Sequence, residues 1–140
     1  MDFTWFSRWQ PQLLAILRIV VALLFIEHAA IKLLGFPAAG QPGLQQVGSF
    51  LWIAGLIELV TGVLVLLGLF TRLAAFVAAG EMAVAYWMVH APQSTFPMIN
   101  GGDAAILYCF VFLYLVFAGP GVWSIDDVRS RTRTAPDLKH

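Results

Sequence analysis

The sequence predicts an all-α, polytopic membrane protein: an antiparallel bundle of four transmembrane helices with both termini in the cytoplasm. Three observations support this prediction: the composition, four long apolar segments, and a one-sided distribution of Lys and Arg. Of the 140 residues, 60% are hydrophobic and only 11% are charged, and the mean hydropathy is +0.82. A soluble domain is typically about 45–50% apolar and about 25% charged. A chain this short could not bury so much apolar surface in one soluble core, so a membrane protein is expected.

The four apolar segments lie at about 12–34, 47–70, 72–91 and 103–119. At 1.5 Å per residue, each is long enough, or nearly so, to cross a hydrocarbon core of about 30 Å. None alternates with a period of two, so helices are predicted rather than strands. The first segment has no convincing cleavage site after it, so we expect it to be retained and not removed as a signal peptide. The very short link before Thr71 predicts a helical hairpin, with Thr71 capping the third helix.

The positive charges predict the orientation. Loops 35–46 and 91–102 contain no Lys or Arg, whereas six cations fall on the other side of a four-span chain: Arg8, Arg72, Arg129, Arg131, Arg133 and Lys139. The positive-inside rule then places both termini in the cytoplasm. Residues 1–123 are predicted to form the transmembrane domain and residues 124–140 a basic cytoplasmic tail. The formal net charge is zero, so we expect lipid as the main environment and no nucleic-acid partner.

Ionisable residues inside the predicted spans are the candidates for a function. A charge at mid-span costs about 2.5–3.5 kcal/mol, so such residues are rarely exposed to lipid. Glu58 shares a helix face with Gly55 and Gly62, and small residues allow close helix packing in membranes. We therefore expect Glu58 and Glu81 to face the bundle interior, near each other or near a cation. The others in this group are Arg18, Glu27, His28, Lys32 and His90, and Asp103 begins the fourth segment.

Two interpretations of these residues remain open. In the structural one, they pair with each other and fix the helix register, for example Glu58 or Glu81 with Arg18 or Lys32. In the functional one, they line a polar pocket that opens toward the outer side, partly walled by Trp52, Tyr86 or Trp87. The candidate ligand-binding residues are His28, Lys32, Glu58, Glu81, His90 and Asp103. Glu58 and Glu81 are also the candidates for proton exchange, and no other catalytic residue is predicted.

A metal or haem site is the weaker alternative. His28 and His90 lie at similar depths on different helices and could form a pair of imidazole ligands. However, the sequence has no i, i+4 histidine pair, no H-x-x-E motif and only one cysteine, Cys109. We therefore expect no metal.

Several motifs resemble the DoxX family, in order over about residues 13–126. They are Glu27-His-Ala-Ala-Ile-Lys-Leu, Gly68-Leu-Phe-Thr-Arg-Leu, Gly80-Glu-Met-Ala-Val-Ala-Tyr with His90-Ala-Pro, Asn100-Gly-Gly-Asp, and Phe117-Ala-Gly-Pro-Gly. The resemblance implies a four-helix inner-membrane protein. The family pattern maps onto His28, Lys32, Glu58, Thr71, Arg72, Glu81, His90, Asn100 and Asp103, with aspartate at the last position where the family often has glutamate. Some relatives are subunits of archaeal thiosulfate:quinone oxidoreductase or are linked to quinol oxidase, and others to thiol and oxidative stress.

Two functions are compatible with these observations. The first is a redox-associated oxidoreductase subunit that binds a quinone or similar small aromatic, with His28, His90 or Lys32 donating to its carbonyl groups. No electron carrier is evident in the chain, so this function implies a redox partner protein. The alternative is a non-enzymatic small-molecule carrier or a membrane scaffold for other proteins. The sequence leaves open whether the chain is itself an enzyme and whether it forms homo-oligomers.

Overall fold

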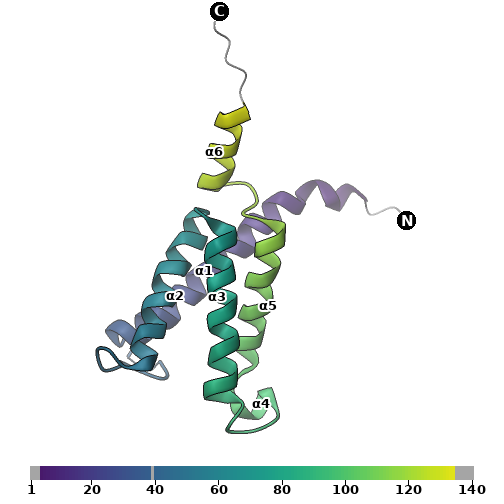
Figure 1. Ribbon diagram of the computed structural model, residues 1–140. Coiled ribbons are helices and arrows are strands. Elements are labelled where there is room, and N and C mark those ends of the chain that lie inside the picture. The colour runs from purple at the N-terminus through teal and green to yellow at the C-terminus, as the bar shows by residue number, and fades with distance from the viewer. Residues whose placement is uncertain (1–3, 39, 135–140) are drawn as a thin grey trace, which may run out of the picture.

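The protein is built from helices throughout the described residues, 4–38 and 40–134, of a computed structural model (Figure 1). In chain order they are the 3₁₀-helix η1 (Thr4–Trp9), α1 (Gln10–Leu34), α2 (Phe50–Leu67), α3 (Thr71–Ala85), the π-helical turn η2 (Tyr86–His90), α4 (Pro97–Asn100), α5 (Asp103–Ala118) and α6 (Ile125–Thr134). No strand occurs in these ranges. The all-α prediction is confirmed.

Three helical stretches are long and apolar enough to cross a membrane: Thr4–Leu34, Phe50–Leu67 and Thr71–His90. Helix α5 is apolar but has only 16 residues, or about 24 Å of helix. The protein is therefore a multi-pass membrane protein, and α5 as a fourth span stays a prediction.

The helices form two pairs that are joined in the middle. Helix α1 packs mainly on α2, and α3 packs mainly on α5, while α2 and α3 connect the pairs. Figure 1 shows α2, α3 and α5 running in alternating directions, with α1 crossing them obliquely. The start of α1 and helix α6 lie at one end of the bundle, here named the α6 end, and the 35–49 loop and α4 lie at the other, the α4 end.

Glycines bring α1 and α2 into close contact. A Cβ atom added at Gly55 would lie 3.0 Å from the Lys32 Cβ, and one at Gly62 would lie 2.8 Å from the Ile26 Cγ1. These distances are at or below the closest approach that side chains tolerate, so α2 presents bare backbone to α1 here. The predicted small-residue face of α2 is thus buried against a neighbouring helix, and Glu58 lies between the two glycines on that face.

Arg18 holds the α6 end together. Its side chain is fully buried and donates hydrogen bonds to four backbone carbonyl groups. The acceptors are the oxygens of Val65 at 2.7 Å, Leu66 at 2.6 Å, Pro120 at 2.8 Å and Trp123 at 2.8 Å. Helix C-termini leave carbonyl groups without helical partners, and a guanidinium can satisfy several at once. Arg18 therefore joins the end of α2 to the segment that follows α5 and is not paired with Glu58 or Glu81.

The cap of α3 is different from the predicted one. Thr71 does not cap its own helix; the carboxylate of Asp126, in α6, accepts from the backbone N–H groups of Phe70 at 3.0 Å and Thr71 at 2.9 Å and from the Thr71 hydroxyl at 3.0 Å. Partial burial by itself raises the pKa of Asp126, but these hydrogen bonds and nearby Arg129 outweigh it and hold that pKa below its ordinary value. A residue 55 positions away thus supplies the cap, which local sequence patterns do not reveal.

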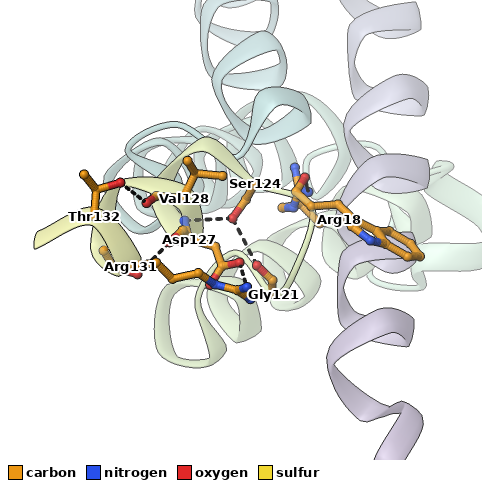
Figure 2. A network of polar contacts seen from close by, with 9 residues as sticks. Arg18, Gly121, Ser124, Asp127, Val128, Arg131 and Thr132 are labelled. Atoms are coloured by element: carbon orange, nitrogen blue, oxygen red, sulfur yellow. Dashed lines mark hydrogen bonds and ion pairs between the residues drawn. The ribbon is translucent and has the colours of Figure 1, made fainter. Parts of the chain in front are cut away.

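The predicted basic tail begins with an ordered helix. The Ser124 hydroxyl donates to the Gly121 carbonyl at 3.0 Å and accepts from the Asp127 N–H at 3.1 Å, which caps α6 (Figure 2). Asp127 also forms an ion pair at 2.9 Å with Arg131, which lies one turn later in α6. Figure 2 places Ser124 beside Arg18, so the same turn closes the end of the bundle. The remainder of the predicted tail, residues 135–140, lies outside the described residues.

Candidate ligand-binding cavity

A cavity of about 540 Å³ lies toward the α4 end of the bundle, and all four long helices contribute to it. Its chemically distinctive lining residues are His28 and Lys32 from α1, Glu58 from α2, Met82 from α3, His90 from η2 and Tyr108 from α5. The loops supply Gln41, Gln93 and Gly101 at the rim. Four of the six predicted ligand-binding residues, His28, Lys32, Glu58 and His90, are therefore brought together from separate helices.

Lys32 and Glu58 form a buried ion pair in the wall of the cavity. The Lys32 ammonium donates to Glu58 Oε1 at 2.5 Å, and the two residues are 7% and 0% exposed. The second oxygen of Glu58, Oε2, is buried and has no hydrogen-bond donor among the described residues. Gly55, one turn before Glu58, allows α1 to approach closely enough for this contact. Lys32 and Glu58 thus pair with each other, as the structural interpretation expects. The free Oε2 atom of Glu58 remains able to accept a hydrogen bond from a ligand.

The two histidines are oriented by backbone carbonyl groups. His28 Nδ1 lies 2.9 Å from the Leu24 oxygen, and His90 Nδ1 lies 2.9 Å from the Asn100 oxygen. Asn100 is itself fixed, because its side chain accepts from the Gly102 N–H at 2.8 Å and donates to the Ser94 oxygen at 2.8 Å. Both rings therefore have defined orientations, and among the described residues each ring is held through its Nδ1 atom alone.

Tyr108 supplies an aromatic wall of the larger cavity. Its ring centroid is 5.4 Å from that of His28, with the planes at 81°. The predicted wall residues Trp52, Tyr86 and Trp87 are not among those that line this cavity. Tyr86 packs edge-on against Trp87 instead. One signal for Tyr108 was present: it follows Ala104 and Ala105 at helical spacing, and these small residues line the same cavity.

Glu81 lies beside a second cavity. This one has a volume of about 300 Å³, lies between α2 and α3, and is lined mostly by apolar side chains. Both carboxyl oxygens of Glu81 are buried without a hydrogen-bond partner in the described part of the chain. Lys32 lines both cavities, whereas Glu81 lines only this second one. Glu81 and Glu58 thus line different cavities that share Lys32 as a lining residue.

Asp103 and Glu27 do not take part in either cavity. Asp103 is exposed at the first residue of α5, where its charge favours the positive end of the helix dipole. Glu27 is exposed on the outside of α1. Asp103 was a predicted ligand-binding residue, but α5 contributes Tyr108 to the larger cavity instead.

A metal centre has no support from the side-chain geometry. Residues 4–38 and 40–134 contain no cluster of three or more His, Cys, Asp or Glu side chains that could hold a metal ion. Cys109 is a free, half-buried cysteine in α5 and is not among the residues that line the cavity.

Comparison with known proteins gives the family. Residues 13–91 match the sequence model of the DoxX family. The matched range includes most of α1 and all of α2, α3 and η2, and it ends before α5. It is shorter than the range of about 13–126 over which the motifs resemble the family. The chain is 46% identical, over 125 residues, to an uncharacterized protein of Haemophilus influenzae; the match covers 86% of this chain and 93% of that protein. It is 27% identical, over 150 residues, to an uncharacterized membrane protein of Mycobacterium tuberculosis, covering 89% of this chain and 86% of that protein. No solved structure matches significantly. The protein is thus a multi-pass membrane protein that belongs to the DoxX family.

Proposed function

We propose that this protein is a redox-associated subunit of a membrane oxidoreductase, which binds a quinone or a similar small aromatic molecule in the larger cavity. The observation that supports this function most directly is the grouping of Lys32, Glu58, His28, His90 and Tyr108 around one space of about 540 Å³. Ligand pockets typically measure about 300–1,000 Å³ and combine apolar walls with a few oriented polar groups.

The chemistry of the wall suits a ring with polar oxygens. Tyr108 offers an aromatic surface, and Lys32 has two ammonium protons left after its hydrogen bond to Glu58. Glu58, with one free oxygen, and Glu81, beside the neighbouring cavity, are the groups that would exchange the protons of a two-electron reaction. Since no electron-carrier motif is evident in the sequence, the electrons would come from or go to a partner protein.

We further propose that α5 is the fourth span, that the chain resides in the bacterial inner membrane and that the α6 end faces the cytoplasm. Cysteine labelling in a Cys109→Ala background tests the orientation, with Gln46→Cys and Thr95→Cys reporting the α4 end and Thr132→Cys the α6 end. An impermeant maleimide should label the first two in intact spheroplasts and Thr132→Cys only after lysis. The reverse pattern would contradict the orientation and would place the cavity mouth in the cytoplasm.

Ligand analysis tests the function. The protein is purified in mild detergent. Its absorption spectrum is recorded, and its lipid extract is analysed by mass spectrometry. The two measurements together detect quinone, flavin and haem. We expect a quinone to copurify with the wild type and with the exposed control Asp103→Asn, and to be lost from His90→Phe. If neither copurified nor added quinone binds the wild-type protein, this function is wrong, and the carrier or scaffold alternative is favoured.

A further inference from the structure

The polar groups around the larger cavity offer an excess of hydrogen-bond acceptors. We infer that the cavity binds the reduced, hydroxyl-bearing form of its ring ligand, a hydroquinone, in preference to the quinone. This inference rests on the proposed function, because it assumes that a ring of this class is the ligand.

The histidines provide the first part of the argument. A carbonyl oxygen can only accept a hydrogen bond, so His28 Nδ1 and His90 Nδ1, each 2.9 Å from one, must carry the proton. In a neutral imidazole the other nitrogen, Nε2, is then an acceptor. No hydrogen bond within residues 4–38 and 40–134 engages either Nε2 atom. Neutral His28 and His90 therefore act as acceptors toward a ligand, which reverses the donor role expected from the sequence.

Glu58 adds to the same excess. Its Oε2 atom is buried without a donor among the described residues. A carboxyl group keeps at least one acceptor oxygen in either protonation state. On the donor side, Lys32 has already committed one of its three protons to Glu58. The Tyr108 hydroxyl can act in both ways.

A hydroquinone matches this arrangement better than a quinone. A quinone has only carbonyl acceptors, so it can accept from Lys32 but leaves the histidine and carboxyl acceptors unpaired. Each hydroxyl of a hydroquinone can accept from Lys32 and also donate to His28, His90 or Glu58. A buried polar group left without its hydrogen bond costs about 1–3 kcal/mol, which corresponds to about a 5- to 150-fold difference in affinity.

Three probes with the same carbon skeleton test the preference. The affinity of the detergent-solubilised full chain is measured anaerobically for trimethylhydroquinone, its dimethyl ether and trimethyl-p-benzoquinone, by isothermal titration calorimetry. We expect the hydroquinone to bind at least about ten-fold more tightly than either other probe. The ether distinguishes hydrogen-bond donation by the ligand from contacts with its ring and oxygens, since it keeps the ring and the oxygens but cannot donate.

Variants assign the preference to the cavity acceptors. His28→Phe combined with His90→Phe should reduce the hydroquinone preference to less than about three-fold, whereas Asp103→Asn should leave it unchanged. If the quinone or the ether binds as tightly as the hydroquinone, the inference is wrong while the proposed function stands. If none of the three binds, the proposed function fails and the inference fails with it. If the preference persists in the double variant, the histidines are not its origin and the argument is overturned.

Discussion

The Lys32–Glu58 pair allows a quantitative test of whether these buried charges stabilise the bundle. Glu58 is fully buried, and its only hydrogen-bond donor among the described residues is Lys32. Lys32→Met therefore leaves a buried carboxylate with no donor, and Glu58→Leu leaves a buried ammonium. Removing one member of a buried ion pair typically costs about 3–5 kcal/mol, because an uncompensated charge remains.

The double variant Lys32→Met/Glu58→Leu distinguishes the pair's stability from its function. Apolar residues of similar volume replace both charges, so the fold should return to within about 1 kcal/mol of the wild type. The thermodynamic cycle then gives a coupling energy of several kcal/mol between the two positions. The same double variant should not bind the hydroquinone probe, since it has lost the cavity's charged donor and one of its acceptors.

The assay is unfolding of the detergent-solubilised protein by SDS, followed by circular dichroism. The pair Gln46→Leu and Thr95→Val, at exposed residues near the same end, serves as a control and should change stability by less than about 0.5 kcal/mol. If each single variant at the pair costs less than about 1 kcal/mol, the charges are not desolvated as described. A double variant as unstable as the singles would instead show that Lys32 and Glu58 do not act on each other.

Three further predictions concern the helix ends and the helix contact. Arg18→Met should cost roughly 3 kcal/mol or more in the same unfolding assay, since it removes four hydrogen bonds from a buried guanidinium; a loss below 1 kcal/mol would contradict the capping role. Asp126→Asn should cost about 1 kcal/mol, the usual size of a helix cap, at neutral pH. Because the pKa of Asp126 is lowered in the folded state, its stabilising effect is present above the ordinary carboxyl pKa. The effect is lost as the pH falls through the lowered pKa, so the variant and the wild type should converge in acid. Gly62→Ala should destabilise by about 1–3 kcal/mol through a clash across the α1–α2 contact, whereas Gly80→Ala, with nothing within 4 Å, should be neutral or stabilising; equal effects would show that the contact is not tight.

The sequence alone determined the class of fold and most of its helices. The predicted 12–34 and 103–119 segments match α1, Gln10–Leu34, and α5, Asp103–Ala118, within two residues. Sustained apolar composition allows little besides a helix in a membrane, so local sequence is sufficient there. The predicted 47–70 segment was too long, since α2 spans Phe50–Leu67, with Ser49 as its cap and left-handed Gly68 at its end. The 72–91 segment became α3 followed by the π-helical turn η2, a local change in hydrogen bonding that periodicity does not reveal.

The tertiary structure decided which polar groups meet. Helix faces predicted that Glu58 points inward, but only the packing of α1 on α2 selected Lys32 as its partner and left Arg18 to bind carbonyl groups. Likewise, the orientation of His28 and His90 depends on carbonyl groups, which every residue possesses and which no sequence motif marks. Asp126 caps a helix that begins 55 residues earlier, and Tyr108 lines the cavity in place of the expected Trp52, Tyr86 or Trp87. The physical reason is common to all of these: hydrophobic periodicity fixes which side of a helix is buried, whereas the hydrogen-bond partners of a buried group depend on the rotation and separation of helices that only the folded chain defines.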